Sequence, residues 1–242
     1  MTTRLDDAPP PGPRRPIRSF VLRQGRMSPA QQRAITTLLP RYGIAYAPAP
    51  IELERVFGRR APVVLEIGFG MGETTAEVAR THPAVDFVGV EVHSPGVGSL
   101  LRRVDELGLT NVRVIQHDAV EVVATMIAPT SLAGIHVYFP DPWPKKRHHK
   151  RRLVQPDFVE AAVNVLIPGG RWMVQSDHDE YFQHMVAVLG AHRQLRPIPW
   201  EMAEADPGPD WKGTNFEVKF SKRGHPILRA AYQRLPRPVT EG

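Results

Sequence analysis

The sequence predicts an α/β fold: a Rossmann-like, mostly parallel central sheet with helices on both faces. The first observation is that strand-like and helix-like segments alternate from residue 63 onward, which is the sign of a parallel sheet covered by helices. The second is the stretch Gly68-Phe-Gly-Met-Gly72, a glycine-rich turn between the first strand and the first helix. A chain of 242 residues can bury one large core.

The chain before residue 61 is expected to hold two smaller parts. Prolines and arginines are frequent in residues 1–20 and apolar side chains are few, so we predict a flexible basic tail there. Residues 21–60 form a predicted helical extension, in which Ser28 fits an N-cap, Pro29 the first helical turn and Gln31 a capping box. This helix is expected over residues 29–39, with Pro40 and Gly43 ending it.

Residues 61–235 are expected to form the main domain, whose elements follow from hydrophobic periodicity and turn residues. Strands are predicted over residues 63–67, 87–91, 112–116, 134–139, 171–175 and 216–220, and helices over residues 73–80, 95–107, 120–128, 156–166 and 178–189. The proline-rich segment 197–209 is interpreted as a loop. We find no internal repeat.

Composition limits the classes of function. Lys and Arg number 31 against 25 Asp and Glu, giving a net charge of +6 and a pI near 9.9; this favours a polyanionic partner such as nucleic acid and leaves a membrane surface open. The sequence has no cysteine, which excludes thiol redox chemistry and suits a reducing cytoplasm. Because no run of about 20 apolar residues and no signal peptide is present, we expect a soluble, cytoplasmic protein.

The glycine-rich turn is the first candidate for a ligand site. Gly68, Gly70 and Gly72 let the backbone turn sharply and let a ligand approach the main chain at a helix N-terminus, although such a turn can also be purely structural. Glu66 stands two residues before the first glycine. Its carboxylate would repel a pyrophosphate and attract a sulfonium or ammonium group, so it favours S-adenosylmethionine over NAD.

Two further acidic residues follow the next two predicted strands. Glu91 ends the second strand, where doubly wound nucleotide-binding folds place an acid that accepts from ribose hydroxyls. Asp118 follows the third strand and could accept from the exocyclic amine of adenine. Taken alone, each could be an ordinary solvated carboxylate. Together with Glu66 and the glycines they outline a site for an adenosyl cofactor.

The most distinctive stretch is Phe139-Pro-Asp-Pro-Trp143 followed by a basic run over residues 145–152. Asp141 follows a predicted strand and is therefore expected at the ligand-binding edge of the sheet. The basic run, which is either a phosphate-binding surface or a solvated charged loop, predicts salt-sensitive binding. Trp143 either stacks on an unstacked base or packs to brace the loop. His148 and His149 are adjacent rather than at ligand spacing, so no metal site is expected.

These motifs, with Gln24-Gly-Arg-Met-Ser28, Gln31-Gln-Arg-Ala34, Ser176-Asp177 and Thr214-Asn-Phe-Glu217, resemble in order and spacing the bacterial tRNA (guanine-N7-)-methyltransferase family over about residues 18–220. The resemblance implies a class I methyltransferase fold. It also implies methyl transfer from S-adenosyl-L-methionine to N7 of guanine 46 in the tRNA variable loop, with S-adenosyl-L-homocysteine as the product. The sequence leaves a monomer or a homodimer open.

The resemblance also assigns roles to individual residues. Those assigned to the cofactor are Glu66, Glu91, Asp118 and Asp141, beside the turn formed by Gly68, Gly70 and Gly72; Asp141 is also the catalytic residue. Those assigned to the tRNA substrate are Lys145, Asp177, Thr214, Asn215, Phe216 and Glu217, with Arg147, His148, His149, Lys150, Arg151 and Arg152 as an RNA-contacting region. From the residues alone, Asp177 is instead expected to cap the helix that starts at His178.

The chemistry can be argued without the family. Guanine N7 carries an in-plane lone pair and no proton, so it can attack a methyl carbon without a strong general base. The purine becomes cationic, and a fixed carboxylate such as Asp141 favours that charge movement and can orient the ring. The alternatives are a methyltransferase for another RNA nucleotide or a small molecule, a non-enzymatic RNA-binding protein with a degenerate cofactor fold, and an NAD-dependent oxidoreductase. Glu66 and the intact acidic set argue against the last two.

Overall fold

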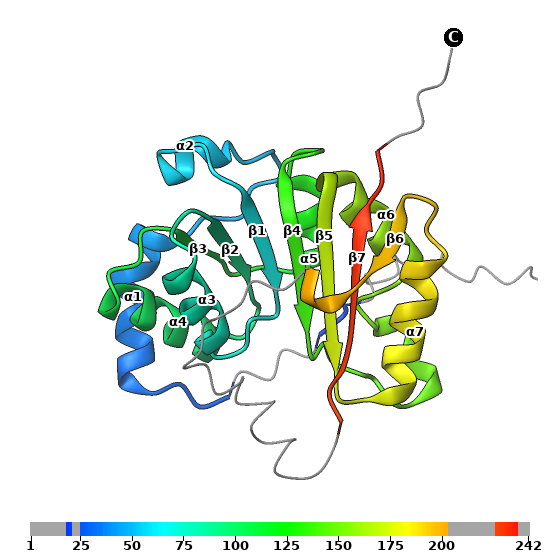
Figure 1. Ribbon diagram of the computed structural model, residues 1–242. Helices are drawn as coiled ribbons and strands as arrows, with labels where there is room; N and C mark the ends of the chain where they lie inside the picture. The colour runs from blue at the N-terminus through cyan, green and yellow to red at the C-terminus, as the bar shows by residue number, and fades with distance from the viewer. Residues whose placement is uncertain (1–17, 21–24, 203–225, 237–242) are drawn as a thin grey trace, which may run out of the picture.

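The protein, described as a computed structural model over residues 18–20, 25–202 and 226–236, is built on one central sheet (Figure 1). Seven strands follow the order β3-β2-β1-β4-β5-β7-β6. Strands β1 to β5 pair in parallel, and β7 runs antiparallel to both β5 and β6. This mostly parallel sheet confirms the predicted fold class.

The strands are β1 (Val63–Ile67), β2 (Asp86–Val90), β3 (Val112–Ile115), β4 (Leu132–Tyr138), β5 (Leu166–Ser176), β6 (Leu195–Ile198) and β7 (Leu228–Arg234). The α-helices are α1 (Pro29–Tyr42), α2 (Leu53–Phe57), α3 (Glu73–Thr81), α4 (Ser94–Glu106), α5 (Ala119–Thr125), α6 (Pro156–Val165) and α7 (Asp179–Gly190), and the 3₁₀ helices are η1 (Lys146–Arg151) and η2 (Trp200–Met202). The predicted strand over residues 216–220 lies outside the described residues.

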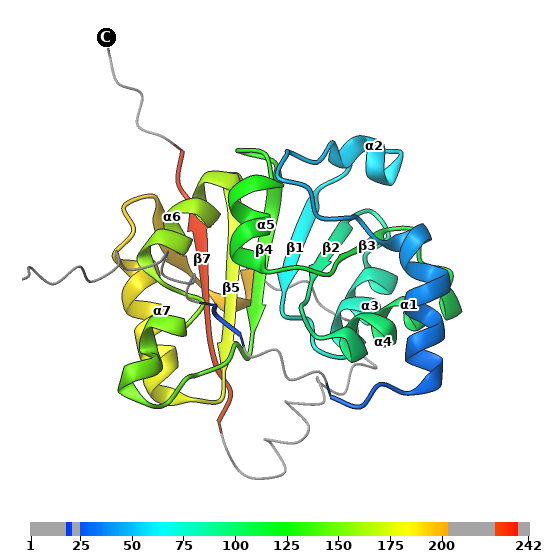
Figure 2. The same cartoon turned by 180° about the vertical axis from the view of Figure 1, so that it is seen from behind.

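Helices cover the sheet on both faces. Helices α3 and α4 lie beside β2 and β3 in Figure 1 and pack on them, and α1 packs on α4. Figure 2 shows α5 and α6 on the opposite face, and α7 shares their apolar cluster. Each layer buries its own apolar cluster, one centred on residues such as Phe87, Leu100 and Val114 and the other on residues such as Leu65, Ile135 and Trp172. The two clusters hold the sheet rigid, so the loops at its edge are built on a fixed base.

Helix α1 begins as its sequence predicts but ends later. Ser28 and Gln31 form the reciprocal capping box, with Gln31 N–H donating to Ser28 Oγ and Ser28 N–H donating to Gln31 Oε1. The expectation that Pro40 ends the helix is wrong, because Pro40 lies in the last turn and the helix continues to Tyr42. The carbonyl that loses a donor there belongs to Thr36, which is exposed, so water can satisfy it. Gly43 caps the end, as expected.

Helix α4 contains Gly96 and Gly98 because two other segments approach it closely. A Cβ atom at position 96 would lie 2.1 Å from the carbonyl oxygen of Gly70, and one at position 98 would lie 2.7 Å from that of Gln31. Neither distance leaves room for a side chain. The two glycines therefore let the glycine-rich turn and α1 both rest on α4.

The last two strands of the described chain were not predicted. Strand β6 contains Pro197, but it is the edge strand of the sheet, where a missing N–H is tolerated. Strand β7 contains Arg234, which is buried and donates a hydrogen bond to the carbonyl oxygen of Leu166. The interpretation of residues 197–209 as a loop is therefore wrong at its start.

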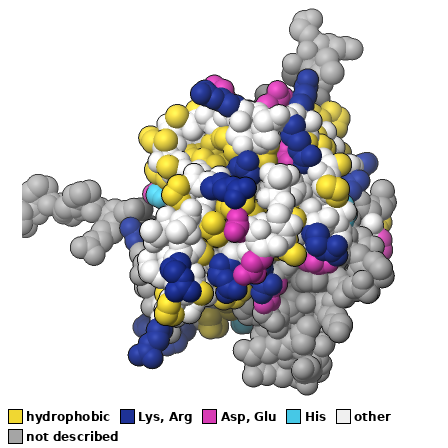
Figure 3. Space-filling view, turned by 90° about the vertical axis from the view of Figure 1, so that its left-hand side faces the viewer, with side chains coloured by type: hydrophobic (Ala, Val, Ile, Leu, Met, Phe, Trp, Pro, Cys, Tyr) yellow, Lys and Arg dark blue, Asp and Glu magenta, His cyan; other side chains and the backbone are white. Residues whose placement is uncertain are grey.

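The side of the molecule formed by α1, α2 and α4 carries many arginines, and most have an acidic partner. Figure 3 shows this side, with Lys and Arg side chains interspersed with Asp and Glu. The ion pairs there are Arg41–Asp105, Arg55–Glu52, Arg59–Asp86, Arg60–Glu54, Arg102–Glu106 and Arg103–Glu73. We call these residues the paired arginines. Among the described residues, no helix has the length and apolar character needed to cross a membrane.

Candidate active site

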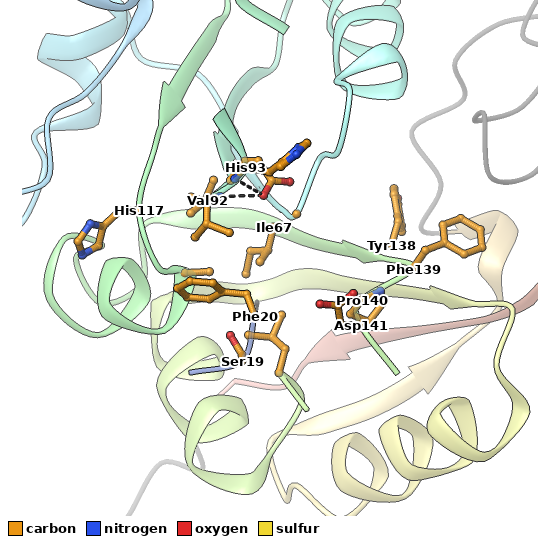
Figure 4. Close-up of a pocket in the computed structure, with 15 residues that line it drawn as sticks. Ser19, Phe20, Ile67, Val92, His93, His117, Tyr138, Phe139, Pro140 and Asp141 are labelled. Atoms are coloured by element: carbon orange, nitrogen blue, oxygen red, sulfur yellow. Dashed lines mark hydrogen bonds between the residues drawn. The ribbon is translucent and has the colours of Figure 1, made fainter. Parts of the chain in front are cut away.

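A pocket of about 270 Å³ opens at the carboxyl ends of β1, β2 and β4 (Figure 4). It brings together Gly68, Glu91 and Asp141, three residues that the sequence analysis had singled out. These residues follow three neighbouring strands, and the carboxyl ends of parallel strands meet at one edge of a sheet. The sheet topology therefore explains why residues so far apart in the chain share one pocket.

The glycine-rich turn needs its glycines. Gly68, Gly70 and Gly72 have φ values of +75°, +57° and +72°, a left-handed conformation that side chains with a Cβ rarely adopt. Gly72 is the N-cap of α3, so the turn delivers the helix N-terminus to the pocket. The backbone of this turn can thus face a ligand at close range.

Glu91 fastens the turn to the end of β2. Its Oε1 accepts hydrogen bonds from the backbone N–H groups of Val92 at 2.7 Å and His93 at 2.9 Å, and its Oε2 accepts from Gly70 N–H at 3.1 Å. The dashed lines in Figure 4 mark the bonds from Val92 and His93. The carboxylate oxygens are therefore held at the pocket wall, where they can also accept from ligand hydroxyls.

Glu66 lies beneath the pocket rather than on its surface. It is on β1 and only 5% exposed; this burial, with a smaller contribution from the negative charge of Glu91, raises the pKa of Glu66 to about 7. A cation bound above it would favour the ionised form and lower that pKa again. Glu66 can thus respond to a positively charged ligand by losing a proton.

Asp118 lies in an adjoining pocket that shares Phe20, Val92 and His117 with the first. Its side chain accepts from Val120 N–H at 3.0 Å as the N-cap of α5, and burial raises its pKa. His117 stacks on the ring of Tyr46 with centroids 3.6 Å apart. The two adjoining pockets together give an elongated site with acids at three strand ends.

The sequence analysis missed Arg18, Ser19 and Phe20 as site residues. Ser19 and Phe20 line the first pocket, and Arg18 and Phe20 line the adjoining one. In the view of Figure 4, Phe20 lies between His117 and Asp141. The proline-rich composition of the preceding residues gave no signal of this, because the contacts depend on the tertiary fold. The last three residues of the predicted tail thus form part of the site.

Asp141 lies on a backbone segment with unfavourable torsion angles on either side. Phe139 has φ of +51° and Trp143 has φ of +46°, and left-handed backbone costs a non-glycine residue of order 1 kcal/mol. Asp141 is at the mouth of the pocket, where the surrounding protein atoms displace water and raise the pKa of its carboxyl group. The segment 139–143, which we call the Asp141 loop, is therefore a constrained carrier of one carboxylate.

Trp143 packs within the protein in this structure. Its indole N–H donates to the carbonyl oxygen of Ser19 at 3.0 Å. The guanidinium of Arg151 lies 4.8 Å from the ring centroid on one side, and His148 makes an edge contact at 5.7 Å. Of the two roles considered for Trp143, these contacts match the brace for the loop.

The basic run forms the 3₁₀ helix η1 next to the Asp141 loop. Lys145, Lys146, Arg147 and Lys150 are exposed, and none has an acidic partner within the described part of the chain. Arg152 differs, since its side chain is only 2% exposed. Among the predicted RNA-contacting residues, the structure thus exposes Lys145, Arg147 and Lys150, half-buries His148, His149 and Arg151, and places Arg152 in the interior.

The remaining predicted substrate residues are placed only in part. Asp177 follows β5, but the cap of α7 is His178, whose ring accepts from Tyr181 N–H, so the expectation that Asp177 caps this helix is wrong. Thr214, Asn215, Phe216 and Glu217 lie outside the described residues. Within the described residues, no group of three or more His, Asp and Glu side chains could hold a metal ion.

Solved structures with a similar fold are methyltransferases. The aminoglycoside resistance methyltransferase NpmB1 aligns with a TM-score of 0.52 and 16% identity over 76% of this chain and 92% of its own. The 16S rRNA methyltransferase KamB gives the same score and identity over 76% and 93%. At such low identity the likeness concerns the fold alone. It places the protein in the class I methyltransferase fold, as expected.

The family follows from the sequence comparisons. Residues 60–230 match the model of a family described as putative methyltransferase. The tRNA (guanine-N(7)-)-methyltransferase of Nitrosospira multiformis is 49% identical over 92% of this chain and 96% of its own length, and that of Nitrosomonas eutropha is 52% identical over 88% and 94%. The chain belongs to the bacterial tRNA (guanine-N7-)-methyltransferase family, a family of methyltransferases that use S-adenosyl-L-methionine.

The residues of the two pockets fit that donor. Glu91 offers oxygens for ribose hydroxyls, Asp118 an acceptor beside the adjoining pocket, and the glycine-rich turn a backbone that a ligand can approach. When bound, the donor supplies a methyl group made electrophilic by its sulfonium charge. Glu66, buried behind the turn, is the negative side chain that can balance that charge.

Proposed function

We propose that this protein transfers the methyl group of S-adenosyl-L-methionine to N7 of guanine 46 in the variable loop of tRNA. The observation that carries the proposal is that Asp141 lines the pocket, while exposed cations with no acidic partner among the described residues begin at Lys145, four residues later in the chain. A reacting group and a surface for phosphates thus adjoin each other. The proposed substrate also places the enzyme in the cytoplasm, where tRNA is modified.

Asp141 has two tasks in this proposal. Its carboxylate orients the guanine and stabilises the positive charge that develops on the ring as N7 attacks the methyl carbon. It removes no proton, since N7 carries none. Asp141 is exposed at the mouth of the pocket, where nearby protein atoms displace part of its water and raise the pKa of its carboxyl group. A partly desolvated negative charge interacts more strongly with a cationic ring than one in bulk water.

The cations of η1 have a different task. Lys145, Lys146, Arg147 and Lys150 provide positive charge for the tRNA backbone, a contact that weakens as salt rises because bound counterions are released. Asp177, at the end of β5, and residues 214–217 are proposed to contact the base. These groups fix which nucleotide enters, whereas the cations hold the folded RNA.

The test of the proposal uses an atom-level change in the substrate. Purified protein is incubated with labelled donor and a tRNA transcript that carries either guanine or 7-deazaguanine at position 46. We expect transfer to the first and none to the second, which lacks the nucleophilic nitrogen, with equal binding of both. Methylation of the 7-deaza transcript at another nucleotide would support the alternative of a different RNA acceptor.

The matched protein variants are Asp141→Asn and Asp141→Ala. Removing one group that stabilises charge in a transition state typically costs about 100-fold to 1000-fold in kcat. We expect that loss in both variants, with salt-sensitive tRNA binding unchanged. An essential base that titrates near neutrality and is traced to Asp141 would contradict the role given to this carboxylate.

A further inference from the structure

We propose that Arg152 is a positioning residue for this reaction, which holds the Asp141 loop against helix α7 and does not contact tRNA. The inference rests on the proposed function and refines it, because the family resemblance counts Arg152 among the RNA-contacting residues. It depends on three features of the structure: the burial of Arg152, the identity of its partners, and the backbone that those partners belong to.

Arg152 is enclosed in the protein. Its side chain is 2% exposed, which leaves no surface for a phosphate group. An arginine side chain keeps its charge in the interior, so its donors need partners there. The guanidinium also lies over the ring of Tyr181, 5.0 Å from the centroid, and Tyr181 is itself fully buried in the core.

The hydrogen bonds of Arg152 reach three separate segments. Nε–H donates to the carbonyl oxygen of Pro142 at 3.0 Å, and Nη2 donates to Glu180 in the first turn of α7 at 3.1 Å. Nη2 also lies 3.1 Å from Nε2 of His149. Because a guanidinium can only donate, this ring nitrogen is the acceptor. One side chain thus ties the Asp141 loop, η1 and α7 together.

Arg152 acts on the position of Asp141 through its hydrogen bond to Pro142. Pro142 follows Asp141 directly, and its carbonyl belongs to the peptide that enters Trp143, the residue with φ of +46°. A backbone in that conformation relaxes unless its surroundings hold it. At the other end of the loop, Phe139 N–H is held by the carbonyl oxygen of Gln175 at 2.9 Å. Asp141 is therefore held from both sides, and Arg152 and the bond from Trp143 to Ser19 anchor the side that follows it.

A lysine at position 152 could not make the same set of hydrogen bonds. The planar guanidinium points Nε–H and Nη2–H at two acceptors on different segments, while an ammonium on a flexible chain is a point charge. Within the part of the chain that the structure describes, exposed neighbours such as Arg147 and Lys150 have no such set of acceptors. Identical residue types within one short run thus serve two purposes, which the sequence alone does not distinguish.

The experiment compares variants at positions 147 and 152 by steady-state kinetics with tRNA. Arg152→Met and Arg152→Lys are expected to lower kcat, by about 100-fold and about 10-fold, since a misplacement of about 1 Å can cost that much. KM for tRNA should stay within about twofold of the wild-type value, and so should the slope of log affinity against log salt concentration. Arg147→Gln, the matched control at an exposed cation of the same run, should raise KM and lower the slope of log affinity against log salt concentration by about one, with a smaller change in kcat.

A second measurement separates positioning from general destabilisation. Arg152→Ala leaves a space that a guanidinium ion can enter, so added guanidinium should restore part of kcat, whereas ammonium should not. The same addition to Arg147→Ala, which removes an exposed side chain, should restore nothing. Glu180→Gln, which keeps the shape of a partner but removes its charge, should lower kcat in the same direction as Arg152→Lys. Unfolding midpoints of all variants show that the assayed protein is folded.

The proposal is overturned if the Arg152 variants raise KM and flatten the salt dependence like Arg147→Gln, or if they fold and turn over tRNA at the wild-type rate. An Arg152→Ala protein that folds but gains nothing from guanidinium also counts against it. These outcomes differ from failure of the proposed function, in which the wild-type protein itself would transfer no methyl group to guanine 46.

Discussion

Two regions of this protein are rich in arginine, and they differ in what the arginines face. On the side formed by α1, α2 and α4 the paired arginines each have an acidic neighbour, whereas the exposed cations of η1 have none in the described chain. A paired cation is already neutralised and attracts a polyanion weakly. From this difference we predict that the pairing of each charge, rather than the net charge, locates the nucleic-acid surface.

The strongest test of this difference is to remove the exposed positive charges in η1 and at Lys145 just before it. A variant with Lys145, Lys146, Arg147 and Lys150 changed to Gln should bind tRNA about a thousandfold more weakly at low salt, because each lost phosphate contact removes roughly 1 kcal/mol and one released counterion. Binding is measured by filter retention over a range of salt concentrations, and the slope should fall by about three.

The matched control changes four paired arginines, at positions 41, 55, 60 and 102, to Gln. It removes the same number of positive charges from the other region and should alter tRNA affinity by less than about threefold. If both variants lost affinity equally, charge pairing would not distinguish the two regions.

A second prediction contrasts two buried acids on the sheet. Asp86 on β2 is bound by Arg59, while Glu66 on β1 has no basic partner among the described residues. The pKa of Glu66 is raised to about 7 in the folded protein against an ordinary value near 4.3 when unfolded. Between these values the folded state holds the extra proton, so this group makes stability fall as pH rises from about 4 to 7.

Glu66→Gln should remove that fall. We expect the variant to gain on the order of 3 kcal/mol over wild type at pH 8 and almost nothing at pH 4, while losing affinity for the cationic donor. Denaturant unfolding at the two pH values and donor titration by calorimetry measure the two effects. Equal stability gains at both pH values would argue against the raised pKa as the cause.

Arg59→Met tests the other member of that contrast. It leaves the buried carboxylate of Asp86 without the guanidinium that lies 2.6 Å away. Because Arg59 is 40% exposed and partly screened by solvent, we expect a loss of about 2 kcal/mol rather than the larger cost of breaking a fully buried pair. Urea unfolding measures the loss, and tRNA affinity should not change.

The smallest expected effect belongs to the surface pair Arg102–Glu106 on α4. Its side chains are 45% and 58% exposed, and such i,i+4 pairs contribute about 0.3–0.5 kcal/mol. Arg102→Ala should therefore change the unfolding free energy by no more than that, in a way that vanishes in 1 M salt. A loss above about 1 kcal/mol would show that the paired arginines do more than neutralise their acidic partners.

Much of the fold could be predicted because local patterns and tertiary structure agree. The parallel strands and the helices between them appear within a few residues of their expected bounds, since each combines apolar periodicity with a clear start or stop. The failures occur where tertiary position overrides local chemistry. Pro197 is compatible with a strand only because β6 is at the edge, and Arg234 with β7 only because the carbonyl of Leu166 meets it.

The candidate site could be predicted to the same degree. Gly68, Glu91 and Asp141 do share a pocket, because strand ends in a parallel sheet converge. The contribution of Phe20 could not be predicted, since nothing in its neighbours signals where the chain crosses the sheet edge. Nor could the burial of Arg152 be distinguished from the exposure of Lys150, because both belong to one charged run and only contacts with Glu180 and Pro142 separate them.

The close contact between Gly96 and the glycine-rich turn limits which substitutions this protein tolerates. The nearest carbonyl, that of Gly70, would lie 2.1 Å from any added methyl group, so an alanine there would displace Gly70, whose N–H donates to Glu91 at the pocket wall. A substitution hidden inside a helix, touching neither substrate, would thereby deform the cavity that receives the methyl source. Sensitivity to mutation in this enzyme therefore extends one layer deeper than its pocket wall.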